Sequence, residues 1–186
     1  INNSGVPNLI AVHQDYSKNA FDIALSYSKN IGGTKVGCFF SSFEEEVVTD
    51  IFGEQAILTG GLPKIISASF DVLVESGYNP IVAWFVCYYE VKSIIDLFHK
   101  DGFEFLNNSI SNIAEYGGAT RGDFLIDDSV KIKMKKMIKQ IQSGDFVKEW
   151  DNEQQKKLTL KLNRKKIKST NIEQMNIKML KILFKK

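Results

Sequence analysis

Hydrophobic side chains recur along this chain mainly at helical spacing. Apolar positions from Ala20 to Tyr27 share one face of a helix that Asp15 can cap and that ends near residue 30. The same spacing predicts further helices at about residues 42–58, 63–75, 81–99, 107–116 and 129–142. Two apolar runs, 9–12 and 35–41, instead predict short strands, the first of them buried. The pattern therefore predicts a mainly α-helical protein with a small strand component.

Capping residues, glycine and proline set the expected helix boundaries. Ser42 stands three residues before Glu45, which is the spacing of a capping box, and Asp127-Asp128 can cap the helix at 129–142. Pro80 suits a first helical turn. The glycines predict interruptions or ends at residues 60–61, 102 and 117–118.

The helix expected at 81–99 is apolar nearly all round its first half. Such a helix belongs inside a protein or at a subunit contact, so its one early charge, Glu90, is expected to have a partner. That partner could be a cation or a lysine, or Glu90 could simply reach solvent.

The net charge of +2 hides an asymmetry along the chain. Residues 151–186 hold 11 Lys and Arg against 3 Asp and Glu, which leaves 13 against 19 for residues 1–150. The lysine-rich stretch 156–168 predicts looser structure and a solvated face, without the interleaved aromatic residues typical of nucleic-acid binding. The final stretch is expected to pack back on the body through Ile177, Leu180 and 182–184. We expect no nucleic-acid partner.

Cysteine usage and hydropathy predict a soluble protein of a reducing compartment, the cytoplasm. Cys38 and Cys87 both lie in apolar surroundings without a CxxC spacing, so they read as small core residues. The longest apolar run, 81–89, is about half of the roughly 20 residues that span a bilayer, so no membrane association is expected. The sequence begins at Ile1 and opens almost at once on a strand, as an excerpt from a longer chain does.

The candidate chemistry centres on Asp50 and Glu54. Two carboxylates four residues apart on a helix point the same way and can chelate one hard cation, and Glu46 would extend the row. A solvated acidic face has the same spacing, so this pattern alone leaves both interpretations open. Glu90 on its apolar helix favours the metal.

Other reactive arrangements are missing from the sequence. His13 follows the first strand and His99 ends a helix, where each has a structural role, and no Ser/His/Asp or Cys/His set can be argued. No glycine-rich phosphate-binding loop is present, so a nucleotide would have to bind elsewhere.

Several strings resemble the short (class I) form of ketol-acid reductoisomerase, in that family's order and spacing. They are GVPNLIAVHQD (5–15), TDIFGEQA (49–56), SISN (109–112), AEYG (114–117) and IDDSV (126–130), with a weaker echo in NIE (171–173). The similarity runs from residue 5 to about residue 150.

The resemblance implies an enzyme of valine, isoleucine and leucine biosynthesis. It converts 2-acetolactate or 2-aceto-2-hydroxybutyrate to a 2,3-dihydroxy acid by an alkyl migration that needs two Mg2+ ions and a reduction by NADPH. It also implies three parts: the end of the N-terminal Rossmann domain (1–14), a helical knotted domain (15–150) and a basic C-terminal tail (151–186). NADPH would bind to the missing part of the Rossmann domain, so this excerpt alone is expected to be inactive.

The resemblance also assigns the site residues. Asp50 would bridge the two Mg2+ ions, Glu54 would bind one of them, and Glu90, a catalytic residue, would bind the other from the second subunit of a homodimer. Ser111 would hold the substrate carboxylate, with Ile110 and Ala114 beside its alkyl group. Valine at position 86 departs from the family pattern E-C-x-x-E, here VCYYE (86–90), so the second Mg2+ is expected to bind more weakly. Tyr89 and Thr59 are milder departures.

Two functional hypotheses follow. The first is the metal- and substrate-binding part of the enzyme, competent when joined to its nucleotide domain. The second is a non-catalytic or degraded dimerisation module that keeps the fold. Metal binding at Asp50, Glu54 and Glu90 would distinguish them. The preferred substrate and the choice between NADPH and NADH cannot be predicted from these residues.

Overall fold

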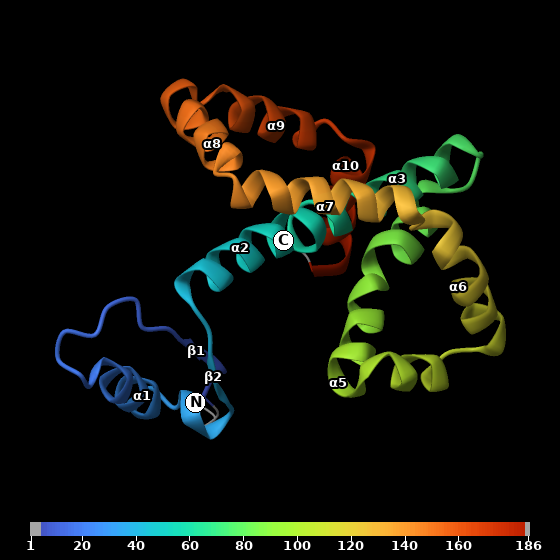
Figure 1. The fold of residues 1–186 in the computed structure, drawn as a ribbon. Coiled ribbons are helices and arrows are strands. Elements are labelled where there is room, and N and C mark those ends of the chain that lie inside the picture. The colour runs from blue at the N-terminus through green and yellow to red at the C-terminus, as the bar shows by residue number, and fades with distance from the viewer. Residues whose placement is uncertain (1–4, 185–186) are drawn as a thin grey trace. The chain divides into compact units, whose positions relative to one another are not determined.

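The computed structural model describes residues 5–184 and divides the chain into two compact units, Ile1–Gly53 and Glu54–Lys186. Residues 1–4 of the expected Rossmann remnant (1–14) and residues 185–186 of the expected basic tail (151–186) lie outside the described residues. Helices dominate and strands are confined to one short pair (Figure 1), which confirms the mainly helical class.

The first unit contains two strands and two helices, in the order β1 (Asn8–Ile10), α1 (Ala20–Asn30), the 3-10 turn η1 (Gly33–Lys35), β2 (Cys38–Phe40) and α2 (Phe43–Gly53). The strands pair in parallel, with Asn8 opposite Cys38 and Ile10 opposite Phe40. The expectation of a buried first strand is wrong for most of it, because Ile10 is buried whereas Leu9 is 58% exposed. The cause is that the two-stranded sheet has little covering its faces.

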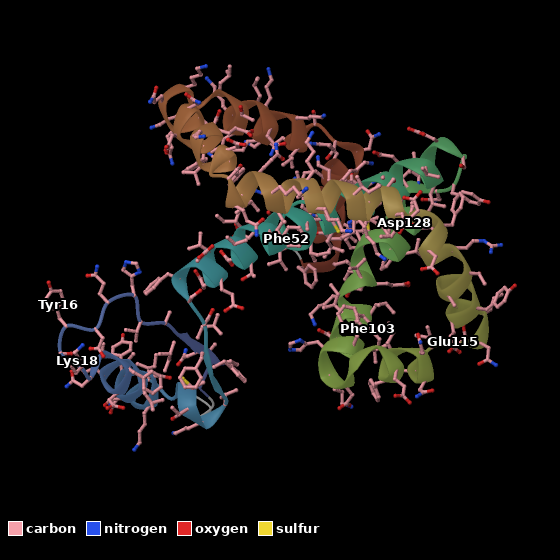
Figure 2. The ribbon with its side chains drawn as sticks, viewed as in Figure 1. Tyr16, Lys18, Phe52, Phe103, Glu115 and Asp128 are labelled. Atoms are coloured by element: carbon pink, nitrogen blue, oxygen red, sulfur yellow. The ribbon has the colours of Figure 1, made fainter. Side chains whose placement is uncertain are left out.

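Hydrogen bonds explain how the first unit is connected. Helix α1 begins later than expected, at Ala20, and its N-cap position is Asn19 instead of Asp15. The Asp15 carboxylate still accepts from the backbone N–H of Ala20, at 3.1 Å. The loop before α1 carries Tyr16 and Lys18, whose side chains extend from the ribbon (Figure 2). Buried Ser28 donates to the Asn8 side chain at 2.8 Å and thereby ties α1 to β1. Gly33 is required at this junction, since a Cβ there would lie 1.6 Å from the Asn8 Oδ1 atom.

Helix α2 begins at the expected capping residue, Ser42, but the reciprocal bond of a capping box is replaced by one to Ser41. The Ser42 hydroxyl accepts from the backbone N–H of Glu45 at 3.0 Å, and the Glu45 carboxylate accepts from the Ser41 hydroxyl at 3.1 Å. Three acidic residues in the first turn favour the positive end of the helix dipole.

The second unit is entirely helical in its described part. Its elements are the π segment η2 (Glu54–Leu58), α3 (Gly61–Glu75), α4 (Pro80–Trp84), the π segment η3 (Phe85–Tyr89), α5 (Val91–Ser109), α6 (Asn112–Leu125), α7 (Asp128–Gln142), α8 (Asp145–Lys156), α9 (Leu158–Lys168) and α10 (Asn171–Phe184). Pro80 occupies the first turn of α4, and Asn79 caps that helix by accepting from the Ile81 N–H at 2.8 Å. Asp127 caps α7 through Ser129.

The core of this unit lies where α10 packs against α3 and α4. Its buried members are Phe70, Ala83, Trp84, Ile172 and Met179. The final stretch therefore packs back as expected, but through the wrong residues. Ile177, Ile182, Leu183 and Phe184 are each at least 40% exposed, because the face of α10 that meets the core is the one carrying Ile172, Asn176 and Met179.

Two other expectations about helices are wrong. The stretch 156–168 is not loose: its larger part forms α9. Helix α6 begins at Asn112 and runs through Gly117 and Gly118, because glycine inside a helix costs only about 1 kcal/mol. The break expected at Gly102 is confirmed, because Asp101 and Gly102 (φ of 85°) have non-helical backbone angles, so one helical stretch of α5 ends close to His99 and a second runs on to Ser109.

One helical run is long and apolar enough to cross a membrane by length and composition. It extends over Phe43–Glu75, and only 6% of its most apolar 18-residue window is buried. A helix whose apolar side chains are covered by another protein surface passes the same test, so the finding is weak evidence for a membrane.

Candidate metal and substrate site

Two π segments mark the elements that carry the predicted metal ligands. In η2 the backbone N–H of Thr59 donates to the carbonyl of Glu54, five residues earlier, at 2.9 Å. In η3 the N–H of Glu90 donates in the same way to Phe85 at 3.0 Å. Glu54 thus begins one π segment and Glu90 directly follows the other. Single π turns inside α-helices occur frequently at functional sites.

Glu90 lines a largely apolar hollow of about 460 Å3 in the second unit. Val86 lines the same hollow, together with Leu58 and Leu62 from η2 and α3 and with Phe98 from α5. Glu90 is the only charged residue among those that line it. The expectation that Glu90 is buried is wrong for this chain by itself, since its side chain is exposed.

Asp50 and Glu54 are also exposed. Asp50 lies in the last turn of α2 in the first unit, and Glu54 opens the second unit. The Glu54 main chain is fixed by three donors, because its carbonyl accepts from the N–H groups of Thr59 and Gly60 and from the Thr59 hydroxyl at 3.0 Å. Threonine at position 59 therefore has a structural use, which is to close the π turn that begins at Glu54.

The three carboxylates remain available to a cation. The ion pairs of the described residues, Lys92 with Asp96 and Lys148 with Asp145, involve none of them. Over residues 5–184, however, no three His, Cys, Asp or Glu side chains come together as a metal site. The oxygen donors suit Mg2+ chemically, but the described part of one chain does not complete its coordination.

Ser111 has the position expected of an anion-binding residue. It is the N-cap of α6, and its hydroxyl oxygen accepts from the backbone N–H of Ala114 at 3.4 Å. A helix N-terminus favours a carboxylate, although Glu115 in the first turn of α6 (Figure 2) adds one negative charge there. Ile110 is half-buried and Ala114 exposed. None of the three lines the hollow that contains Glu90.

Aromatic side chains surround the second π segment. Trp84, which is buried, lies with its ring centroid 5.7 Å from that of Tyr88 and 5.3 Å from that of Tyr89. Tyr89 also meets Phe85 edge to face at 5.5 Å. The tyrosine at position 89 is thus part of an aromatic cluster that stiffens η3 next to Glu90.

Neither the histidines nor the cysteines line the hollow that contains Glu90. His13 is exposed with its ring edge toward Phe43, at 6.3 Å, and His99 is exposed on α5. Burial raises the pKa of the Cys87 thiol, which keeps it protonated and unreactive. Cys38 is half-buried, and its sulfur lies 3.4 Å from the Ser28 hydroxyl.

The sequence is similar to two family models over most of its length. The model described as "Ketol-acid reductoisomerase, C-terminal domain" matches residues 43–184. The chain belongs to the ketol-acid reductoisomerase family. The model described as "Acetohydroxy acid isomeroreductase, NADPH-binding domain" matches residues 1–37. The boundaries expected from the sequence, after residues 14 and 150, stay predictions.

A solved member of the ketol-acid reductoisomerase family has the same fold. Its structure is described as that of an NADH-preferring ketol-acid reductoisomerase from an uncultured archean, and it is 38% identical to this chain with a TM-score of 0.90. The similarity covers 94% of this chain and 53% of the solved chain. This sequence therefore spans about half the length of that reductoisomerase.

Sequence reasoning missed the π segments and the hollow between them. Hydrophobic periodicity does not distinguish a π turn from an α turn over five residues. One signal was available in Gly60-Gly61, since a Cβ at these positions would lie 1.9 Å from the Gln55 carbonyl oxygen and 2.0 Å from that of Ala56. Adjacent glycines after an apolar helix thus mark a close backbone approach.

Proposed function

We propose that this chain supplies the metal- and substrate-binding part of a ketol-acid reductoisomerase, in the cytoplasm. The observation that carries the proposal is the set of Asp50, Glu54 and Glu90 on a family domain, all exposed and none of them in an ion pair with a described residue. Carboxylates left without a counter-charge are suited to a divalent cation, and two of the three, Glu54 and Glu90, lie at π turns.

The proposed reaction has two steps. An alkyl group of 2-acetolactate or 2-aceto-2-hydroxybutyrate migrates to the neighbouring carbonyl carbon, and the ketone so formed takes a hydride from a nicotinamide cofactor and a proton. The product is a 2,3-dihydroxy acid, from which valine, isoleucine and leucine are made.

Each candidate site residue has a distinct role in this proposal. Asp50 would contribute to both Mg2+ sites, Glu54 to one of them, and the partner subunit's Glu90 to the other. Bound Mg2+ would supply Lewis-acid polarisation of the substrate oxygens. Ser111 holds the substrate carboxylate at the start of α6, and Ile110 and Ala114 accept its alkyl group. Val86, an apolar residue in the hollow of Glu90, leaves the second Mg2+ with fewer protein ligands.

A second copy of the chain would complete the site. Large apolar side chains remain exposed along both units, among them Ile57, Leu58, Ile65 and Val72 on the run Phe43–Glu75. A surface of this kind marks an interface with another protein. The homodimer and the knotted path of the helical domain are thus parts of the proposal.

The nucleotide cofactor would bind to the remainder of the N-terminal domain. Strands β1 and β2 form a parallel pair, and such pairs are stable only as part of a larger, covered sheet. Residues 1–37 match an NADPH-binding domain, which supports NADPH, whereas the solved relative is described as NADH-preferring. Turnover assays therefore need both cofactors.

Calorimetric titration of the chain with Mg2+ tests the proposal, alongside its molar mass by light scattering. We expect saturable Mg2+ binding by a dimer, and Asp50→Asn should weaken binding at least about tenfold because it removes a charged ligand. Asp123→Asn, a matched loss of one exposed carboxylate on α6, should leave binding unchanged.

Two outcomes would redirect the interpretation. A dimer that does not bind Mg2+ would support the alternative, a non-catalytic dimerisation module. Val86 favours this alternative because it brings no oxygen ligand to the hollow of Glu90. Mg2+ binding equally weakened by both variants would indicate a diffuse acidic surface and would contradict the proposed site. If the site is preserved, joining the nucleotide domain should restore turnover of 2-acetolactate.

A further inference from the structure

A basic hollow of about 480 Å3 lies at the helical hairpin of α8 and α9, within the second unit. Five cationic side chains line it: Lys157, Lys161, Arg164, Lys165 and Lys168. Lys157 directly precedes α9, the other four recur along that helix at spacings of three and four residues, and together they form a basic stripe. Like charges at this spacing destabilise a helix unless an anion lies near them.

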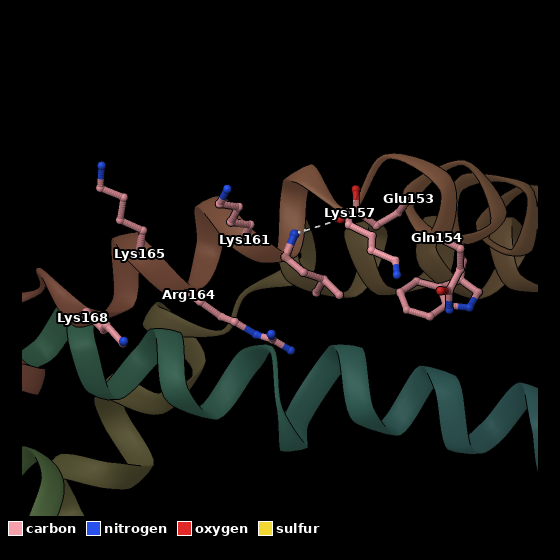
Figure 3. A pocket seen from close by; sticks show the side chains of 9 residues that line it. Glu153, Gln154, Lys157, Lys161, Arg164, Lys165 and Lys168 are labelled. Carbon is pink, nitrogen blue, oxygen red and sulfur yellow. Dashed lines mark hydrogen bonds between the residues drawn. The ribbon is translucent and has the colours of Figure 1, made fainter.

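The cations of the stripe divide into two groups. In Figure 3 the side chains of Lys157, Arg164 and Lys168 extend to one side of α9, whereas those of Lys161 and Lys165 extend to the other. Arg164 and Lys168 are four residues apart on α9 and therefore share one helix face, whereas Lys157 directly precedes the helix. These three side chains form the cationic wall of the hollow.

The acidic residue that lines the hollow forms no ion pair with this wall. The single acidic lining residue, Glu153, accepts the backbone N–H groups of Thr159 and Leu160 at 3.1 and 3.0 Å and so caps the start of α9. The hydrogen bond from the Leu160 N–H is the main cause that holds the pKa of Glu153 below its ordinary value. The ion pairs found over residues 5–184 include none of the five cations.

We propose that this hollow binds a phosphorylated small molecule of about nucleotide size. Its volume falls in the range of about 300 to 1,000 Å3 that is usual for small-molecule sites. An arginine guanidinium matches phosphate oxygens in a fork, and lysines add point charges. Trp150 and Leu160 line the hollow beside the cations and offer an apolar wall for an organic group.

Tryptophan fluorescence and calorimetry with two probes, pyrophosphate and ADP, test this site at constant ionic strength. Trp150 is 41% exposed and lines the hollow, whereas Trp84 is 1% exposed and lies in the core, so an emission change reports Trp150. Saturable binding is expected for both probes. ADP should bind more tightly than pyrophosphate because its adenosine contacts the apolar wall.

A pair of double variants locates the site. Arg164→Gln with Lys168→Gln should weaken pyrophosphate binding at least about tenfold, because each removes a charge-assisted hydrogen bond. Lys135→Gln with Lys139→Gln removes the same charge from exposed positions on α7 and should change affinity by less than about twofold. Trp150→Phe should abolish the emission change while calorimetric binding of pyrophosphate persists. Far-UV circular dichroism checks that all variants are folded.

Several results would overturn the proposal. Equal weakening by the two double variants would show a general response to net charge. If sodium chloride gave the same fluorescence and calorimetric signals as the two probes, those signals would report only the screening of the protein's charges. A single-stranded oligonucleotide of roughly 15 nucleotides that binds far more tightly than ADP, with steep salt dependence, would identify a nucleic-acid surface instead.

Discussion

At the scale of single residues, Val86 is the position that bears most on the proposed metal site. It lines the same hollow as Glu90 and is 47% exposed, so the position is open to a longer polar side chain. Valine offers no oxygen, which leaves Glu90 as the only charged residue there. In the proposed site, this residue would therefore decide how many protein ligands the second cation has.

Replacing Val86 with glutamate should strengthen Mg2+ binding about tenfold or more, because a second carboxylate would reach the same hollow. Calorimetry of Val86→Glu against wild type measures the change. Val82→Glu is the matched control, since Val82 is 57% exposed on α4 and does not line the hollow. Unchanged affinity in Val86→Glu would contradict a metal site next to Glu90.

Three carboxylates near helix ends should make the free energy of unfolding depend on pH in the acid range. The Ser129 hydroxyl holds the pKa of Asp127 below its ordinary value, and the Ser143 hydroxyl does the same for Asp145. Glu153 is held low chiefly by the Leu160 N–H. A carboxylate with a lowered folded-state pKa stabilises the fold above its unfolded-state pKa, and the contribution is lost as pH falls through the folded-state value.

The free energy of unfolding should therefore decrease as pH falls from about 5 towards 2. Urea unfolding at a series of pH values measures this slope. The double variant Asp127→Asn with Glu153→Gln should be less stable at neutral pH and should show a shallower slope. Identical slopes for the variant and the wild type would contradict the assigned role of these two carboxylates.

At the scale of elements, the π segment η2 depends on the two glycines that follow it. The π turn brings the carbonyl oxygens of Gln55 and Ala56 against Gly60 and Gly61, where a Cβ would lie within 2.0 Å. The extra residue per turn shifts the register of every side chain after Glu54 relative to a continuous α-helix. This shift sets which residues of α3 face the core.

Gly60→Ala should destabilise the chain by at least about 1 kcal/mol, although alanine is the better helix former. Gly118→Ala provides the opposite control, because nothing lies within 4 Å of its added Cβ inside α6. That variant should gain about 0.5 to 1 kcal/mol. Thermal and urea unfolding compare the two, and a stabilised Gly60→Ala variant would show that η2 tolerates an ordinary α turn.

Helix α10 offers a second comparison between two faces of one element. Met179 is 4% exposed in the core against α3 and α4, whereas Ile182 is 59% exposed. Met179→Ala should cost about 2 to 5 kcal/mol of unfolding free energy through the cavity it leaves. Ile182→Ala should stay within about 0.5 kcal/mol. A larger loss in Ile182→Ala would mean that a partner covers the outer face of α10.

At the scale of the whole molecule, much of the apolar surface is not covered within one chain. Val72 on α3 is 60% exposed, and the most apolar window of the run Phe43–Glu75 is almost entirely unburied. Large exposed apolar patches are rare on monomers. The isolated chain is therefore expected to associate with itself.

The melting temperature should rise with protein concentration, because association stabilises the folded state by mass action. Val72→Asp should raise the dimer dissociation constant at least about tenfold. Thr120→Asp, an exposed polar position on α6, is its control. Analytical ultracentrifugation measures both. A monomer that binds lipid vesicles would instead support a membrane role for the run Phe43–Glu75.

The sequence by itself determined the helical class, the family and most caps, because these depend on local spacing and on short strings. The bonds of Ser42 with Glu45 and of Asp127 with Ser129 follow from chemistry within one turn. Tertiary structure decided which face of α10 is buried, the pairing of β1 with β2, and the hollow shared by Val86 and Glu90. Periodicity could not supply these, since they depend on π turns and on contacts between residues far apart in the chain.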